Sequence, residues 1–483
     1  MNRIYIFCIS LVCLPFLASG QKLSALKKDA LNEAIQLQEQ THQMCQQLWD
    51  FAETALKEHQ SSQLLINSLQ QEGFSIEKNI AGMPTAFIAS YGSGTPIIGI
   101  LAEYDALPGV GNAPVPQREA RDDGVSSGHG CGHNLFGAAS VHAAIALKRT
   151  MEKKNIKGTI KLFGTPAEET VVGKVYMAKE GVFDNLDAVL EWHPSDETGV
   201  TFLPTLAMNN FEVEFFGQAA HGAADPWNGR SALDAVEMMN FGVNLMREHV
   251  YPTTRMHYVI ADGGGAPNVV PEYAKVWYYV RDTSRNNVEE HYNRILKIAE
   301  GAALATNTSH KVTLVTGVHQ YNHNEPLLKA LHQNLIIVGP PQFTEEEQNW
   351  AHELQEFTGK NTKGFHTGIN EIPPDWKKRP VQGGSTDVAE VSFIAPTAGL
   401  IVATAPMGVP WHSWATTASH GTLAGFKGAD VATRVLTLTG IDLLTNEKLR
   451  KEAKDYFIQQ TGGKEYQSPL PQDQQVTLPA RNP

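Results

Sequence analysis

The 483-residue chain is long enough for two domains with a substantial buried core. Its 42% hydrophobic and 19% charged residues are ordinary for a folded globular protein. With 39 Lys and Arg against 51 Asp and Glu, its net charge of −12 provides no general attraction for nucleic acid or anionic membranes. The composition therefore argues against a nucleic-acid-binding function.

Residues 1–20 have the pattern of a secretory signal peptide. A short positive region precedes an apolar stretch at 4–17, which is too short to span a membrane, and small residues at 18–20 offer a cleavage site. A buried N-terminal helix is the alternative, but the stretch has no amphipathic pattern, and no lipid-anchor motif surrounds its cysteines. We therefore expect an exported protein, periplasmic or secreted, whose mature chain keeps only Cys45 and Cys131.

The predicted elements alternate between helices and short strands over the first part of the chain. In order they are a helical region at 23–72, strands at 85–91 and 97–101, a helix at 135–151, and strands at 159–163 and 188–192. Such alternation is typical of an α/β sheet covered on both faces.

The pattern changes near residue 208. The next predicted elements are a strand at 211–216, a helix at 231–249, a strand at 274–280, a helix at 288–305 and a strand at 311–315. The sheet pattern then resumes near Tyr321 and ends with a strand at 399–404 and a helix at 422–444. These patterns predict a sheet domain at 21–207 and 319–450, an α+β insertion at 208–318, and a tail at 451–483 whose last part, 462–483, is poorly ordered.

One local pattern carries metal-binding chemistry. His129-Gly130-Cys131-Gly132-His133-Asn134 places a thiol and an imidazole two residues apart in a glycine-flanked loop, where both could reach one or two metal ions. Alone, the Cys131–His133 pair is as compatible with a structural role as with metal binding. A thiol without a disulfide partner in an exported protein nevertheless needs a reason, and a metal would be one.

Carboxylates and histidines follow several other predicted strands. Glu168 and Glu169 follow the strand at 159–163, and adjacent carboxylates point differently, so one could bind metal while the other faces a reacting water. A solvated surface pair is the alternative interpretation. The remaining candidates, each at or after the end of a further strand, are Asp105, His193 and His412. Their shared position at strand ends predicts one site at that edge of the sheet.

The motif order resembles metallopeptidase family twenty, which includes aminoacylases, carboxypeptidases that release glutamate from folates, and auxin-amino-acid amidohydrolases. The Cys-Gly-His variant is similar to the amidohydrolase branch. The resemblance covers about residues 25–445 and is carried by Asp-Ala-Leu-Pro at 105–108, Cys-Gly-His at 131–133, Pro-Ala-Glu-Glu at 166–169, Gly-Gly-Ser-Thr-Asp at 383–387 and the segment 405–413.

This resemblance implies a zinc-exopeptidase-like α/β catalytic domain with a central mixed sheet, interrupted by an α+β lid and dimerisation domain. It implies two divalent ions per subunit, most simply zinc, with manganese or cobalt as alternatives. Glu168 becomes the general base, and Asp105 the carboxylate that orients a ligand histidine. The implied metal ligands are Cys131, His133, Glu169, His193 and His412.

The lid contributes further residues by the same resemblance. His221, in the segment 217–222, would stabilise the oxyanion and would reach the active site of a partner chain. Asn268 would contact the carboxylate end of the substrate, and Arg281 could pair with that carboxylate, although an exposed strand-end charge is equally compatible. The sequence departs from the branch at Asn134 and Phe136, where Asp and His are common, and at Glu103, where Asp is common.

The expected function is therefore metal-dependent hydrolysis of a linear amide bond. The substrate would be an N-acyl or N-aroyl amino acid, p-aminobenzoyl-glutamate among them, or a dipeptide. We expect a homodimer, or a complex with a related subunit, without a membrane anchor. A periplasmic binding protein that lost catalysis is the first alternative, but Glu168 is present. A serine hydrolase is the second, but none of the predicted strands leads directly into a Gly-x-Ser-x-Gly nucleophile elbow.

Overall fold

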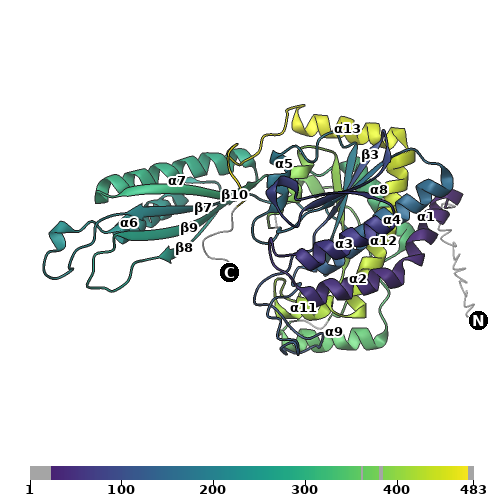
Figure 1. Cartoon of the computed structure of the whole chain (residues 1–483), viewed down its shortest axis with the longest axis horizontal. Helices are drawn as coiled ribbons and strands as arrows, with labels where there is room; N and C mark the ends of the chain where they lie inside the picture. The colour runs from purple at the N-terminus through teal and green to yellow at the C-terminus, as the bar shows by residue number, and fades with distance from the viewer. Residues whose placement is uncertain (1–22, 361–362, 380–383, 477–483) are drawn as a thin grey trace, which may run out of the picture.

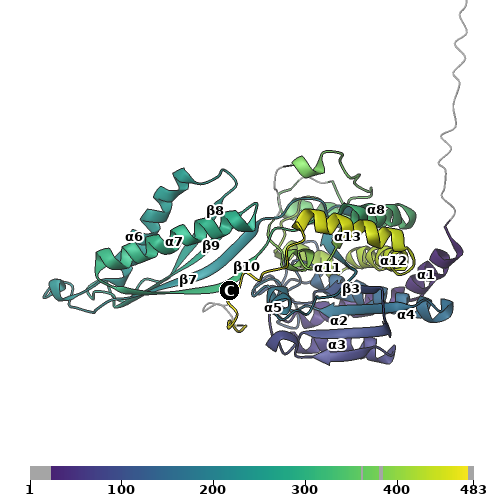
Figure 2. The same cartoon turned by 90° about the horizontal axis from the view of Figure 1, so that it is seen from above.

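The computed structural model describes residues 23–360, 363–379 and 384–476, so the predicted signal peptide lies outside the described residues. Two bodies are visible in Figure 1: a larger one built on a central sheet and, beside it, an elongated one that projects away. Figure 2 shows the same division from above, with α13 and the described part of the tail beside the junction of the two bodies. No helix in the described ranges is long and apolar enough to cross a membrane.

The larger body contains a seven-stranded mixed sheet in the order β1-β2-β4-β3-β5-β11-β6. Its strands are β1 Ser75–Lys78, β2 Phe87–Ser93, β3 Ile97–Ala102, β4 Gly158–Gly164, β5 Ala188–Ser195, β6 Gly199–Val200 and β11 Thr397–Ala403. The four central strands β4, β3, β5 and β11 are parallel to one another, whereas β2 and β6 pair antiparallel at the flanks. The central strands are almost continuously apolar because helices cover both of their faces.

Helices pack around this sheet. The long α4 (His133–Lys154) and α12 (Leu423–Thr445) contact each other and the central strands. The others are α1 Ala25–Gln36, α2 Gln38–Phe51, α3 His59–Gln71, α5 Gly173–Lys179, α8 Glu325–Val338, α9 Glu345–Phe357, α10 Val388–Ser392, α11 Trp414–His420 and α13 Glu447–Thr461. Short 3-10 turns occur at η1 Ile80–Gly82, η2 Pro226–Asn228, η3 Arg247–His249 and η4 Trp376–Lys378. The single helical region predicted at 23–72 is thus three successive helices.

The elongated body is the predicted lid. Its antiparallel sheet has the order β10-β7-β9-β8, with β7 Ala207–Phe216, β8 Arg255–Asp262, β9 Tyr273–Asp282 and β10 Ser309–Val318. The helices α6 Ala232–Met246 and α7 Arg285–Thr306 cover one face. Burial alternates residue by residue along β9, so the other face of this sheet is open. The mixed sheet and the inserted α+β unit confirm the predicted fold class, although β8 was not predicted.

The tail predicted at 451–483 is described as far as residue 476, and the part predicted to be poorly ordered begins at 462, after α13. The residues of the tail before 462 belong to α13, and the described residues after α13 pack along the junction with the lid. The Gln474 side-chain amide donates to the carbonyls of Leu314 at 2.7 Å and Val315 at 2.9 Å, both on β10. Lys179 donates to the Gln474 carbonyl at 2.6 Å. Composition alone does not predict these contacts, because they join the tail to segments distant in the sequence.

Candidate metal centre

The candidate site lies at the C-terminal ends of the parallel strands, as the sequence predicts. Glu103 and Asp105 follow β3, the Glu168-Glu169 pair follows β4, and His193 lies near the end of β5. His412 comes from the loop after β11. The amino end of α4 brings Cys131 and His133 to the same edge.

The loop before α4 needs glycine at position 132. Gly132 has a φ of 77°, and a Cβ there would lie 2.7 Å from the Cβ of Pro194. Either feature alone would strain any other residue. Asn134, one of the departures from the family pattern, donates to the carbonyls of Cys45 at 3.1 Å and His420 at 3.0 Å. It therefore holds the loop in place through backbone contacts.

The five predicted ligands come together as two sets that share one sulfur. The ligand atoms of Cys131, His133 and His193 all lie within 4.8 Å of one another, and so do those of Cys131, Glu169 and His412. The Cys131 Sγ is 3.5 Å from His193 Nε2 and 3.3 Å from His412 Nε2. Two sets that share one thiol would fit two metal ions, with Cys131 contributing to both sets.

Hydrogen bonds orient the ligands for this role. His133 Nδ1 lies 2.8 Å from Asp105 Oδ1, and the other oxygen of Asp105 accepts from the Glu169 backbone N–H at 2.9 Å. His133 Nε2 and Glu169 Oε1 are both buried without a hydrogen-bond partner among the described residues. Buried polar atoms without partners are costly, and a metal ion would satisfy both. The donor set therefore fits a metal.

The electrostatics of the cluster also fit cations. Burial, then repulsion from Glu103, Asp387 and Glu169, raises the pKa of Glu168 well above its usual value. Burial raises the pKa of Glu169 to about 7 and that of the Cys131 thiol well above its usual range. Burial lowers the pKa of His193 to about 4, which keeps that ring neutral and able to bind metal. Crowded carboxylates of this kind retain protons unless cations replace them.

Backbone strain occurs at two positions of the site. Ala167, directly before the two glutamates, has a φ of 61°, and His412 has a φ of 53°. The buried Glu58 accepts from the Ala167 N–H at 3.0 Å and thereby supports this conformation. Non-glycine residues in the left-handed region are costly and cluster at functional sites.

Glu168 lies beside the ligands in a third set. Its carboxylate, the Glu103 carboxylate and a ring nitrogen of His133 are all within 4.8 Å of one another. Glu168 is half-buried and lies outside the two sets that share Cys131. This position suits a carboxylate that faces the reacting water.

The sequence did not reveal the group of charges that supports this set. Lys174, in the first turn of α5, is fully buried and donates to Glu103 at 2.6 Å and to Asp387 at 2.8 Å. One signal was available: Lys174 interrupts the apolar run 171–177, and a lysine there needs a buried acidic partner. The sequence could not identify which acidic residues pair with Lys174.

The lid residues lie at opposite ends of their sheet. Arg281 pairs with Met208 near the root of the lid, where its Nη1 lies 3.4 Å from Ser385 Oγ of the larger body. His221 and Asn268 are exposed near the far end, beyond Phe216, and the Gly222 N–H donates to the Asn268 carbonyl at 2.8 Å. Ten residues of β7 separate the root from the far end, about 30 Å at the usual rise per strand residue. His221 therefore does not reach the Cys131 site of its own chain.

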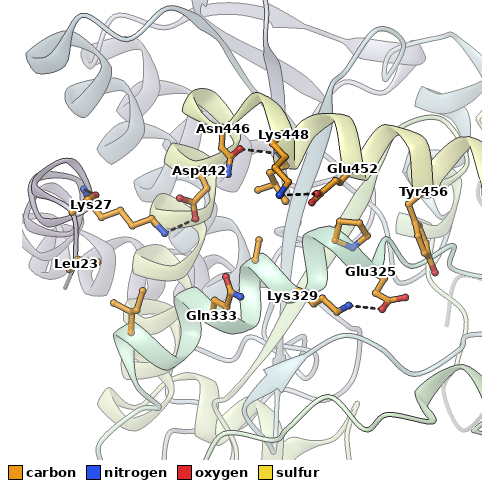
Figure 3. Close-up of a pocket in the computed structure, with 15 residues that line it drawn as sticks. Leu23, Lys27, Glu325, Lys329, Gln333, Asp442, Asn446, Lys448, Glu452 and Tyr456 are labelled. Atoms are coloured by element: carbon orange, nitrogen blue, oxygen red, sulfur yellow. Dashed lines mark hydrogen bonds and ion pairs between the residues drawn. The ribbon is translucent and has the colours of Figure 1, made fainter. Parts of the chain in front are cut away.

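A hollow bordered by α1, α8, α12 and α13 is not a comparable candidate for the functional site (Figure 3). Its charged side chains pair with one another, Lys27 with Asp442 at 2.6 Å and Lys329 with Glu325 at 2.8 Å. None of the described residues that line it is His or Cys. Paired surface charges of this kind carry no sign of a reactive site.

Comparisons with known proteins agree with this geometry. Residues 99–371 match the family model "Peptidase family M20/M25/M40". The chain is 35% identical over 467 residues to one of the subunits of p-aminobenzoyl-glutamate hydrolase from Escherichia coli K12, covering 92% of this chain and 97% of that protein. It is 31% identical to a mouse Xaa-Arg dipeptidase, covering 66% of this chain and 73% of that protein.

Among solved structures, a Bacillus subtilis protein described as a dinuclear metal binding peptidase of the M20 family shares the fold. The TM-score is 0.54 at 18% identity, covering 83% of this chain and 99% of that one. The family match and the similarity to these relatives agree with one another. The chain belongs to peptidase family M20/M25/M40 and is a metal-dependent hydrolase of carbon–nitrogen bonds.

Proposed function

We propose that this protein is an exported dimeric amidohydrolase with a two-metal centre that hydrolyses N-acyl or N-aroyl amino acids. The observation that carries the proposal is the pair of ligand sets that share Cys131, with Glu168 beside them. Cys131, His133 and His193 would hold one ion, and Cys131, Glu169 and His412 the other. When bound, the ions supply Lewis-acid activation of the scissile carbonyl and of water.

The residues of the chain perform the remaining steps. Glu168 takes a proton from the attacking water and returns it to the leaving amine. Asp105 holds the His133 ring through Nδ1, so that Nε2 stays directed into the site. A histidine that donates to the developing oxyanion would complete the site. His412, whose side chain is 54% exposed, marks the open side through which substrate enters.

Arg281 supports an anionic substrate. Its Nε is buried without a hydrogen-bond partner, and no acidic side chain among the described residues forms an ion pair with it. Burial lowers the pKa of this guanidinium, and its carbon Cζ lies 5.4 Å from the centre of the Tyr279 ring. A half-buried arginine at the root of the lid, beside Ser385 of the larger body and without an acidic partner among the described residues, suits a substrate carboxylate. Acyl-amino acids and dipeptides share this free carboxylate, and among them Arg281 favours an acidic side chain, as in p-aminobenzoyl-glutamate, over the cationic side chain of a dipeptide that ends in arginine.

A second copy of the chain would supply the histidine. Because His221 lies at the far end of the lid, it serves a catalytic centre only if that centre belongs to a partner. The lid offers an apolar surface for pairing: β8 is an edge strand, with Val259 52% exposed, and α6 exposes Phe241 at 65% and Leu245 at 60%. A related protein with the same lid surface is the alternative partner.

Export is proposed from the residues at 1–20, which carry the pattern of a cleavable signal. N-terminal sequencing of the protein from the periplasm or medium of expressing cells should begin near residue 21. Recovery of the full chain from the cytoplasm alone would contradict export without affecting the proposed chemistry.

The activity is tested with purified, metal-loaded protein and a panel of amides. We expect amine release from acyl- and aroyl-glutamates or aspartates, and little from dipeptides ending in arginine or lysine, because Arg281 repels a second cation. Protein dialysed against a chelator is the control and should be inactive until Zn²⁺ or Mn²⁺ is restored. Full activity after verified removal of all metal would overturn the proposal.

A further inference from the structure

We propose that Glu103 is a sixth metal ligand of this centre and that Lys174 and Asp387 fix it in the ligating position. The inference rests on the proposed two-metal site and extends it to a carboxylate that follows β3. Glu103 lies two residues before Asp105 and belongs to the third ligand set, with His133 and Glu168.

The contact between His133 and Glu103 is the first observation. His133 Nδ1 faces the Asp105 carboxylate at 2.8 Å, which leaves Nε2 as the ring nitrogen directed into the site. That Nε2 is 3.1 Å from Glu103 Oε2, and it forms no hydrogen bond. A ring nitrogen and a carboxylate oxygen therefore face each other in a buried site. A cation bound by both atoms would satisfy them.

The geometry of that contact favours a shared ion over a shared proton. At 3.1 Å the pair is close enough for a hydrogen bond, yet Nε2 remains without a partner because Oε2 does not lie along the direction of a ring N–H. Two atoms that bind one ion both point at the ion and not at each other, so they do not have hydrogen-bond geometry. With bonds of about 2.0 to 2.2 Å and angles between octahedral and tetrahedral values, they are about 2.8 to 3.6 Å apart.

The second observation is the way in which Glu103 is held. Its Oε1 accepts from Lys174 Nζ at 2.6 Å, which leaves Oε2 directed at His133. Lys174 is in turn fixed by Asp387, which accepts from its Nζ at 2.8 Å and from its backbone N–H at 2.9 Å. All three side chains are at most 1% exposed. Lys174 therefore acts as a positioning residue that selects which oxygen of Glu103 faces the metal.

Charge supports the same assignment. The buried group Glu103, Lys174 and Asp387 contains two carboxyl groups and one ammonium, and the Asp105 carboxyl lies on the other side of His133. Buried carboxylates in excess of cationic side chains are costly, and a cation at Oε2 offsets that cost. Of the two ions, Glu103 would reach the one that His133 binds, because His133 is the residue common to the Cys131–His193 set and the Glu103 set.

The test measures metal binding rather than activity. Metal-depleted whole chain is titrated with Zn²⁺ by calorimetry, and bound zinc is counted after dialysis against a zinc buffer. Glu103→Gln keeps an oxygen acceptor for Lys174 but loses its charge, and it should weaken one of the two zinc sites about 10- to 100-fold, the scale for groups that ligate or support a metal. The other site should change less than about threefold.

Glu191→Gln is the matched control. Glu191 is a buried carboxyl on β5 that accepts from the Tyr321 hydroxyl at 3.1 Å and belongs to none of the three ligand sets. Its substitution should leave both zinc affinities unchanged. The double variant Lys174→Met, Asp387→Asn retains Glu103 but frees it to turn. It should weaken the same zinc site as Glu103→Gln by a smaller factor, and it carries the test if Glu103→Gln does not fold.

The outcomes separate this inference from the proposed function. If Glu103→Gln binds two zinc ions with unchanged affinity while Cys131→Ser loses them, the metal centre stands and Glu103 is not a ligand. If the wild-type chain binds no metal, the proposed function itself is wrong. Equal weakening in Glu191→Gln would show that any nearby buried carboxyl matters, and this too would overturn the assignment.

Discussion

Glu168→Gln is expected to lower kcat by at least about 100-fold, equivalent to nearly 3 kcal/mol of transition-state stabilisation, while both metal sites stay filled. Glutamine keeps the size and hydrogen-bonding capacity of the side chain but accepts no proton from water. Glu168 lies outside the two ligand sets that share Cys131, so metal content and substrate Kd should remain near the wild-type values. Turnover and bound metal are measured on the same preparation.

Glu169→Gln is the matched comparison, because the two residues are adjacent and both are carboxylates. In the wild-type chain, Glu169 Oε1 is buried without a partner among the described residues, and Glu169 Oε2 lies 3.5 Å from His412 Nε2. We expect lower metal occupancy, with activity partly restored by excess Zn²⁺. Loss of metal in Glu168→Gln with retention in Glu169→Gln would reverse the two assignments. Glu168 lies close enough to His133 for this outcome to be a real test.

The position of the site could be predicted because its residues follow the ends of separate strands. The C-terminal ends of parallel strands meet at one edge, so Asp105, Glu169 and His193 converge wherever the strand predictions are roughly right. Errors of a few residues in the strand boundaries did not matter. The Cys131 loop was recognisable for another reason, since its glycines mark a tight turn before a helix.

The support for the site could not be predicted, because it depends on contacts between distant segments. Lys174 meets Glu103 across 71 residues and Asp387 across 213. Nothing local specifies which acids neutralise a buried lysine. The same limit applies to the tail, where Gln474 bonds to β10 across 159 and 160 residues. Composition does not predict these long-range hydrogen bonds.

The lid shows a third limit, in which a residue's function depends on another chain. The motif around His221 was evident, but in the folded chain it lies on the order of 30 Å beyond the root of the lid. The exposed apolar residues of α6 and the free edge of β8 point to pairing of lids. A composite site across such a pair is testable by mixing two inactive variants.

His221→Ala and Glu168→Ala are each expected to be nearly inactive alone. After the chains exchange, a hybrid dimer has one site with an intact Glu168 and an intact His221 from the other protomer, and a second site that lacks both. Half of the dimers in an equal mixture are hybrids and half of their sites are intact, so activity should rise from near zero to about a quarter of wild type.

Exchange is verified with chains that carry different affinity tags, and the hybrid is isolated by purification on both tags. The control mixes Glu168→Ala with Glu169→Ala, whose defects lie in the same catalytic body. In that hybrid one centre lacks Glu168 and the other lacks Glu169, so no site is complete and no activity should return. Recovery in the first mixture alone would locate His221 in the neighbouring active site. Verified hybrids without activity would show that His221 does not act across the dimer.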